Sequence, residues 1–108
     1  MRNSSEQRAL RHYRLRCYRI LGTNVWIGGY EIDLVVRRGR ALAFVEVKSK
    51  SGDRVGDPLE MVGPEKQRRL RRAAEAWLAA HPQAVGLEAR FDVVAVLDGR
   101  LECVRQAF

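Results

Sequence analysis

Two acidic residues and one lysine stand inside otherwise apolar segments of this sequence. Asp33 lies in the run 32–36, Glu46 lies in the run 43–47, and Lys48 follows that run directly. Side chains of these types are rarely buried without a partner, and two neighbouring carboxylates repel each other unless a cation lies between them. Carboxylate oxygens are ligands that Mg²⁺ and Mn²⁺ prefer. The residue types therefore indicate a divalent-metal site, with a lysine that could orient water or stabilise charge on a phosphate.

A β-hairpin would bring these residues together. The β-branched and apolar residues predict neighbouring strands over 30–38 and 41–48. A turn at Gly39-Arg40 would join them, with Gly supplying the positive φ that the first central position of such a turn needs. This turn pairs the residue before it with the residue after it, and it thereby fixes the register of the hairpin.

The register decides which side chains meet. Counting outward from the turn places Asp33 opposite Glu46, and Glu31 opposite Lys48. Directly opposed residues share a face of the sheet, with Cβ atoms about 4.5–5.5 Å apart. Lys48 stays on the face of Glu46 in any register, because side chains two residues apart along a strand point the same way.

Two other arrangements of the hairpin remain open at this point. A turn shifted to Arg38-Gly39 would place the two carboxylates diagonally on one face, and a single bulge would put them on opposite faces. An exposed hairpin carrying cross-strand ion pairs such as Glu31–Lys48 is the alternative to a metal site. Spacing alone does not decide between them.

The rest of the chain predicts the elements that must support this hairpin. Hydrophobic periodicity and the positions of Pro and Gly predict a helix over 4–17, a helix that begins at Pro64 and is stopped by His81-Pro82, strands over 18–27, 90–97 and 100–104, and a loop over 49–63. Together with the hairpin, this order predicts one α/β domain over residues 1–108, with a mixed central sheet flanked by helices.

Apolar residues of the second predicted helix recur at the spacing of one buried face. They are Leu70, Ala73, Ala74, Trp77 and Leu78. The two cysteines fit no metal-binding pattern, and buried thiols are expected for both, Cys17 in the first helix and Cys103 in the last strand. Thiols of that kind suit a reducing compartment.

The basic residues point to a polyanionic partner. The formal net charge of +7 over 108 residues favours nucleic acid, while a basic surface kept for solubility is the simpler alternative. Trp26 and Tyr30 could stack bases, although both are more often core residues. The candidate phosphate contacts are Lys50, Arg54, Lys66, Arg68, Arg69 and Arg72. The sequence offers no signal peptide or membrane-spanning run, so we expect a cytoplasmic protein without membrane association.

Several segments, taken in order, resemble known proteins. Asp33 with Glu46-Val47-Lys48 resembles the PD-(D/E)xK signature of restriction-endonuclease-like nucleases, whose common core runs αβββαβ. Residues 6–96 are similar to the YraN-like family of predicted bacterial endonucleases. The matching pieces are Glu6-Gln7-Arg8-Ala9, Cys17-Tyr18-Arg19-Ile20-Leu21, Asn24, Glu31-Ile32-Asp33-Leu34-Val35, Phe44-Val45-Glu46-Val47-Lys48, residues 66–77, and Arg90-Phe91-Asp92-Val93-Val94.

The resemblance implies roles for individual residues. Asp33 and Glu46 would bind Mg²⁺ or Mn²⁺, the Val47 carbonyl would be a further ligand, and Lys48 would be the catalytic lysine. Glu6 matches a helical glutamate that would face the metal directly or through water; a first-turn glutamate favoured by the helix dipole is the alternative. The chain departs from the family where Tyr30 and Cys17 each replace a usual Gly.

The expected function is metal-dependent hydrolysis of phosphodiester bonds in DNA, including branched or structured DNA. Cutters of branched DNA often act in pairs, so a homodimer is one expectation. A nucleic-acid-binding module that keeps the fold without cutting is the alternative from another class. A protein-interaction scaffold whose charge serves only solubility is a third.

Overall fold

The computed structural model describes residues 4–51 and 58–108. In chain order the elements are α1 (Ser4–Leu15), β1 (Arg19–Ile27), β2 (Tyr30–Arg38), β3 (Ala41–Lys50), the 3₁₀ turn η1 (Pro58–Met61), α2 (Pro64–Ala80), the 3₁₀ turn η2 (Pro82–Ala84), β4 (Glu88–Leu97) and β5 (Arg100–Val104). The predicted αβββαβ order and the mixed α/β class are confirmed. The additional strand β5 is the one expected after Asp98-Gly99.

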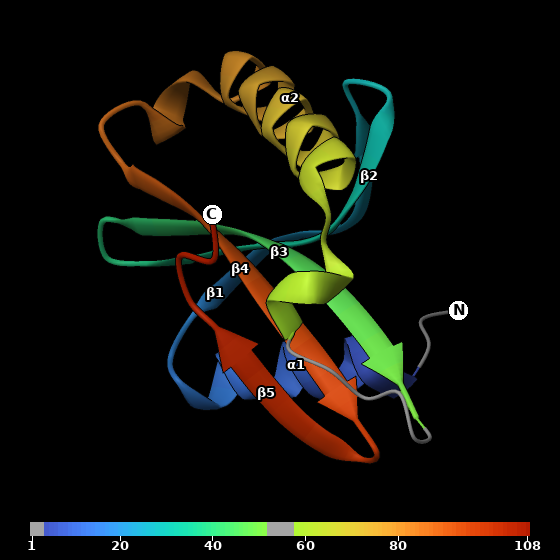
Figure 1. Ribbon diagram of the computed structural model, residues 1–108. Coiled ribbons are helices and arrows are strands. Elements are labelled where there is room, and N and C mark those ends of the chain that lie inside the picture. Colours follow the sequence, from blue (N-terminus) through green and yellow to red (C-terminus); the bar gives the residue numbers. More distant parts are fainter. Residues whose placement is uncertain (1–3, 52–57) are drawn as a thin grey trace.

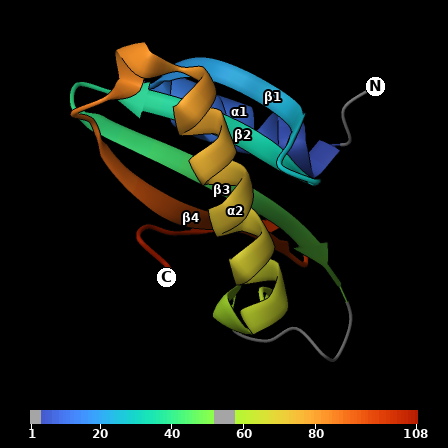
Figure 2. The same ribbon diagram turned by 90° about the horizontal axis from the view of Figure 1, so that it is seen from above.

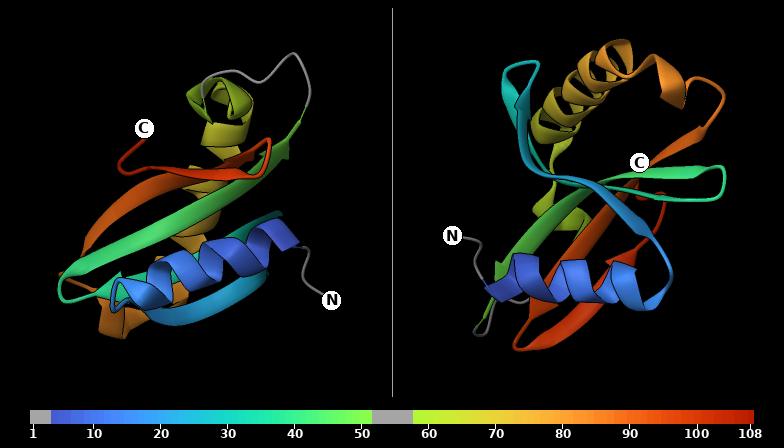
Figure 3. Two further views of the ribbon diagram at one scale, coloured as in Figure 1. Left: turned by 90° about the horizontal axis from the view of Figure 1, so that it is seen from below. Right: turned by 180° about the vertical axis from the view of Figure 1, so that it is seen from behind.

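The strands form one five-stranded sheet in the order β1-β2-β3-β4-β5. Neighbouring strands are antiparallel except β3 and β4, which are parallel. A parallel pair needs a crossover connection, and α2 supplies it. The helices lie on opposite faces of the sheet: α2 crosses one face (Figure 2), and α1 lies along the other (Figure 3).

Each helix buries its apolar face against the sheet. On the α2 face, the predicted stripe of Leu70, Ala73, Ala74 and Trp77 packs on strand residues that include Phe44, and Leu78 is partly buried beside it. On the α1 face, the helix residues Ala9, Leu10 and Tyr13 pack on Leu34, Val36, Ala43, Val45 and Val94. Full burial of one large apolar side chain contributes about 1.5–3 kcal/mol. These two layers fix the sheet between the helices.

The turn at Gly39-Arg40 is confirmed. Arg38 pairs with Ala41, and Gly39 has a φ of +60°, as the first central position of such a turn requires. Asp98 and Gly99 also have positive φ, and Leu97 pairs with Arg100 across them. Both hairpins therefore have the two-residue turns that their sequences predict.

The first helix ends earlier than predicted, and the prediction for Cys17 is wrong. The helix stops at Leu15, and Cys17 has a left-handed φ of +65° and an exposed side chain. A residue in that conformation cannot continue a right-handed helix, and Gly is the residue that adopts it at least cost. The departure from the family's Gly at this position therefore has a structural cost. Cys103 lies in β5, as expected, and is partly buried.

Three other boundaries differ by one or two residues. The strand β1 begins at Arg19, β3 continues to Lys50, and β4 begins at Glu88. The predicted loop over 49–63 accordingly contains the end of β3 and the turn η1. Within the described residues, no helix is long and apolar enough to cross a membrane.

One charged cluster is buried inside the α1 face. The Asp92 carboxylate is fully buried and accepts hydrogen bonds from Tyr13 Oη (2.8 Å), Arg90 Nε (2.9 Å), Arg90 Nη2 (3.1 Å) and the backbone N–H of Gln106 (3.1 Å). Arg90 Nη2 also donates to Tyr18 Oη at 2.8 Å. Hydrogen bonding to Asp92 raises the pKa of Arg90. The carboxylate is thus neutralised and fully hydrogen-bonded by the protein itself.

Candidate active site

The strands β2 and β3 separate at the predicted site. Their ladder ends with Leu34 paired to Val45. Beyond that pair β2 stays with β1 and β3 stays with β4. Figure 1 shows β2 bending beside α2 while β3 continues towards the other end of the sheet. We call the point between Asp33 on β2 and Glu46, Val47 and Lys48 on β3 the fork.

A kink in β1 accompanies the separation. Asn24 has a φ of +48°. It would pair with Asp33, but the β1–β2 ladder has no pair at this position, although the residues on either side are paired. Ile32 packs in the α2 cluster, whereas Leu34 packs in the α1 cluster. Residues two apart in a regular strand share a face, so β2 turns over at Asp33. This local twist opens the sheet where the two carboxylates lie.

The Asp33 carboxylate takes the place of a missing backbone acceptor. Its Oδ2 accepts a hydrogen bond of 2.7 Å from the Val47 N–H, which has no β2 carbonyl opposite it once the ladder has ended. The N–H and C=O of one strand residue point to the same neighbouring strand. We therefore expect the Val47 carbonyl to point into the fork as well, which suits its predicted role as a ligand.

The Glu46 carboxylate is buried, at 5% exposure, and it has few donors. Lys48 Nζ lies 3.3 Å from Glu46 Oε1, and Tyr30 Oη lies 3.4 Å from both carboxylate oxygens. Burial raises the pKa of Glu46, although Lys48 acts against this rise. The Glu46 side chain is therefore short of positive charge.

The Asp33 carboxylate is also short of positive charge. Burial, followed by repulsion from Glu46, raises its pKa to about 7 in spite of the hydrogen bond from Val47. Carboxyl groups with raised pKa values that lie together are typical of sites built for a cation. Both groups offer hard oxygen atoms, so the donor set fits Mg²⁺ or Mn²⁺.

A second lysine, Lys66, joins the fork from the first turn of α2. Its contact with Lys48 lowers the pKa of Lys66. Lysine is unfavourable at the positive end of a helix dipole, so its position in the first turn was a usable signal that an acidic partner lies nearby. We did not predict a site role for it beyond a phosphate contact. The hydroxyl of Tyr30 was also missed as a Glu46 partner.

The predicted partner of Lys48 is wrong. Lys48 forms its ion pair with Glu46, whereas Glu31 is exposed and pairs with Trp26 across β1 and β2. The cause is the fork: counting outward assumed a continuous ladder, and the strands diverge before Glu31 is reached.

Glu6 approaches the fork from α1. Asn24 Nδ2 donates a hydrogen bond of 3.1 Å to Glu6 Oε2, and the Glu6 charge adds to the rise in the pKa of Asp33. The residue therefore lies close enough to affect Asp33 electrostatically. Its position fits both the metal-facing role and the first-turn role.

The described residues among the predicted phosphate contacts lie at the end of β3 and on α2. Lys50 is exposed at the end of β3, and Arg72 is exposed on α2. Arg68 and Arg69 both contact Glu65, with Arg69 Nε 3.2 Å from Glu65 Oε1. Exposed ion pairs of this kind contribute little to stability, so both arginines can exchange that partner for a phosphate. Arg54 lies outside the described residues.

The two aromatic residues differ from each other. Trp26 is 73% exposed, so the expectation that it packs in the core is wrong, and it is accessible for stacking. Tyr30 is partly buried beside Glu46, as described above. Trp77 is buried in the α2 layer, as predicted.

Within residues 4–51 and 58–108, no group of three or more His, Cys, Asp and Glu side chains lies together in a way that could hold a metal ion. A metal at the fork would therefore depend on Asp33 and Glu46, with the Val47 carbonyl and water completing the coordination. Mg²⁺ commonly binds in this way, with one or two carboxylates and several waters.

Comparison with known proteins gives a consistent family match. The sequence profile of the uncharacterised protein family UPF0102 matches residues 5–96. A UPF0102 protein of Methylocella silvestris is 42% identical over 89% of this chain and 76% of its own length. UPF0102 proteins of Shewanella amazonensis and Symbiobacterium thermophilum are 38% and 43% identical, covering 96% and 97% of this chain and 94% and 92% of their own lengths.

Proposed function

The chain belongs to the uncharacterised protein family UPF0102, and from the chemistry of its fork we propose that it is a metal-dependent nuclease that hydrolyses phosphodiester bonds in DNA. The observation that carries the proposal is the pair Asp33 and Glu46, held together at the end of the β2–β3 ladder with Lys48 at 3.3 Å from Glu46. This arrangement supports membership of the restriction-endonuclease-like superfamily, whose PD-(D/E)xK residues it would supply.

Each residue of the fork has a distinct part in this proposal. Asp33 and Glu46 would hold Mg²⁺ or Mn²⁺, with the Val47 carbonyl as a further ligand. The ion would polarise a phosphate oxygen and lower the pKa of a water molecule. Lys48 would orient that water or stabilise charge on the phosphate. Lys66, beside Lys48, would add a second positive charge facing the phosphate.

The charge and surface of the chain support a nucleic-acid substrate. The net charge is +7, and exposed Lys50 and Arg72 lie on the strand and helix that lead to the fork. Branched or structured DNA is the substrate we favour, and cutting both strands of it would call for a homodimer. A DNA substrate and two free thiols fit a cytoplasmic location.

The direct test is cleavage of labelled duplex, single-stranded, flap and four-way-junction DNA with Mg²⁺ or Mn²⁺. We expect cleavage by the natural chain, its loss in EDTA, and its loss in Asp33→Asn and Glu46→Gln. Glu75→Gln is the matched control, because Glu75 is an exposed carboxylate on α2. Cleavage that survives in both fork variants would refute the proposal.

One observation favours a second candidate, a nucleic-acid-binding module without catalytic activity. Among the described residues, no group of three or more His, Cys, Asp and Glu side chains could hold a metal ion. Such a module would bind DNA with steep salt dependence, its affinity would be unchanged by EDTA, and no product would form. The cleavage assay and a binding assay on the same substrates separate the two.

A further inference from the structure

The opposite end of the β2–β3 hairpin carries a second cluster of charge, all of it positive. Arg37 is four residues from Asp33 along β2, about 13 Å at the rise of a strand. Arg19 on β1 is the direct cross-strand partner of Arg37. Like charges placed directly opposite each other in a sheet are destabilising, so this pair calls for a compensating negative charge.

The described residues, 4–51 and 58–108, do not supply that charge. Within the part of the chain that the structure describes, Arg19, Arg37 and the neighbouring Arg38 form no ion pair with a carboxylate. Other arginines do, as Arg40 with Glu88 and Arg90 with Asp92 illustrate. Three guanidinium groups at one end of the hairpin therefore remain uncompensated.

Backbone contacts hold two of these guanidinium groups in place. Arg37 Nε donates to the Gly39 carbonyl at 2.9 Å. Arg38 Nη1 donates to the Arg16 carbonyl at 3.1 Å, and its guanidinium lies over the Tyr18 ring at 4.7 Å. Groups fixed in this way lose less freedom when they bind a ligand, and each keeps N–H donors for it.

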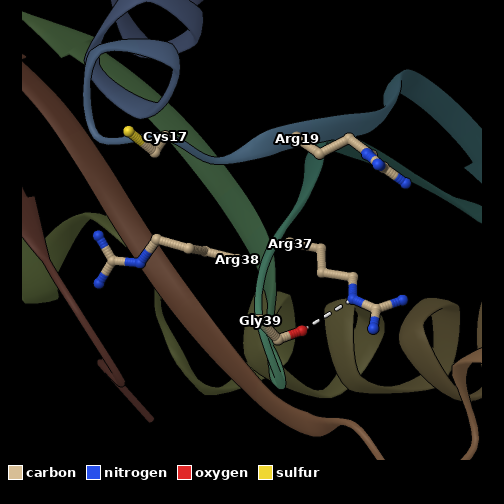
Figure 4. A pocket seen from close by; sticks show the side chains of 5 residues that line it. All are labelled: Cys17, Arg19, Arg37, Arg38 and Gly39. Carbon is tan, nitrogen blue, oxygen red and sulfur yellow. Dashed lines mark hydrogen bonds between the residues drawn. The ribbon is translucent and has the colours of Figure 1, made fainter.

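The same residues line an open hollow. Its volume is about 350 Å³, and Cys17, Arg19, Arg37, Arg38 and Gly39 surround it. Figure 4 shows the Arg19 and Arg37 side chains extending to the same side of the strands, with the Arg37–Gly39 hydrogen bond drawn. Arg19 and Arg37 also line a second hollow of about 260 Å³, beside Trp77 and His81 at the end of α2. A group larger than phosphate therefore has room beside the pair.

We propose that Arg19 and Arg37 form a binding site for a phosphate group, separate from the fork. Planar guanidinium groups bind phosphate oxygens through paired hydrogen bonds. The phosphate is either part of a nucleic-acid backbone or a free phosphate-bearing small molecule. The site is independent of catalysis at Asp33 and Glu46.

The test compares Arg19→Gln/Arg37→Gln with Arg100→Gln/Arg105→Gln, which removes the same charge in and directly after the edge strand β5. In EDTA, inorganic phosphate at ten times its dissociation constant should raise the melting temperature of the natural chain and the control by about 6 °C over chloride of equal ionic strength. The Arg19→Gln/Arg37→Gln variant should show no such rise, and Arg19→Lys/Arg37→Lys should retain part of it.

Binding of duplex DNA, measured by fluorescence anisotropy in EDTA, separates the two sources of phosphate. The affinity for DNA is plotted against salt concentration, both as logarithms, and the slope measures the number of phosphate contacts. If the slope becomes less steep by about two in Arg19→Gln/Arg37→Gln but not in the control variant, the bound phosphate belongs to a nucleic-acid backbone. A phosphate response without that fall identifies a small-molecule phosphate. If Arg19→Gln/Arg37→Gln and Arg100→Gln/Arg105→Gln behave alike in both the phosphate assay and the DNA-binding assay, the proposed site is wrong. This outcome does not depend on the cleavage assay of the fork.

Discussion

Asp92 on β4 and Asp33 on β2 both stand in apolar strand segments, but their carboxylates have different partners. Asp92 accepts hydrogen bonds from Tyr13, Arg90 and the Gln106 backbone, and it is fully buried. Asp33 accepts a hydrogen bond from the Val47 N–H, and its pKa is raised by burial and then by repulsion from another carboxylate, Glu46. The Asp92 charge is compensated by a hydrogen-bonded arginine, whereas Asp33 lies beside a second acid, as the proposed metal site would require.

The number of hydrogen-bond and ion-pair partners distinguishes a buried acid that stabilises this fold from one that is a candidate for binding. A buried charge with a complete set of partners stabilises the arrangement around it, and removing one partner is costly. A buried charge without such a set lowers stability, and its persistence points to a role in binding.

The largest expected effect is on stability at Asp92. Asp92→Ala leaves the partly buried Arg90 guanidinium without its partner, and we expect the free energy of unfolding to fall by about 3–5 kcal/mol. Urea unfolding followed by circular dichroism measures this value. Asp33→Ala in metal-free buffer is the comparison, and it should cost far less. The reverse order of the two losses would refute the contrast.

The next effect is on metal binding and cleavage at the fork. Asp33→Asn and Glu46→Gln should each lower the cleavage rate at least about 100-fold, equivalent to about 2.7 kcal/mol, and should weaken Mn²⁺ binding measured by calorimetry. Neither should lower stability in EDTA, because each removes a repelling charge. Mn²⁺ binding that is unaltered in both variants would place the metal elsewhere.

Two matched Tyr→Phe changes compare the hydrogen bonds made to the Asp92 carboxylate with those made to the Glu46 carboxylate. Tyr13→Phe removes a buried bond of 2.8 Å to the Asp92 carboxylate, and a bond to a charged group contributes about 1.5–3 kcal/mol. Tyr30→Phe removes contacts of 3.4 Å to Glu46 and should cost less than about 0.5 kcal/mol. Chemical unfolding of both variants in EDTA gives the two values. Equal losses would show that the fork is as well satisfied as the Asp92 cluster.

The smallest expected effect is the pH dependence of the metal-free chain. The pKa of Asp33 rises from 3.8 to about 7 on folding, so between these values the folded state binds more protons than the unfolded state. Stability must then fall as pH rises from about 4 to about 7, and flatten above it. We expect the melting temperature of the natural chain to drop over this range relative to Asp33→Asn. A rise relative to Asp33→Asn would contradict the assigned environment.

Much of the hairpin could be predicted from the sequence, because local rules govern it. The Gly39-Arg40 turn fixed the pairing of Arg38 with Ala41, and that register leads towards Asp33 and Glu46. The fork itself could not be predicted, because it depends on the twist of β2 between two packed helices. The wrong assignment of Lys48 to Glu31 follows from that missing information.

The Asp92 cluster shows a different limit. Arg90 and Asp92 are two residues apart in a strand, so period-two geometry places them on one face, and this was a readable signal. The contribution of Tyr13 comes from a helix 79 residues away in sequence. Contacts of that range are set by tertiary packing, and no local pattern in the chain encodes them.

The left-handed Cys17 gives experimenters a labelling position in the natural sequence. Its thiol is exposed, whereas burial raises the pKa of Cys103, which lies partly buried beside Tyr13. Thiol reagents attack the thiolate of accessible cysteines, so a maleimide dye should attach at position 17 first. That dye would be in the wall of the arginine hollow, where its fluorescence could report the arrival of an anion without any engineered residue.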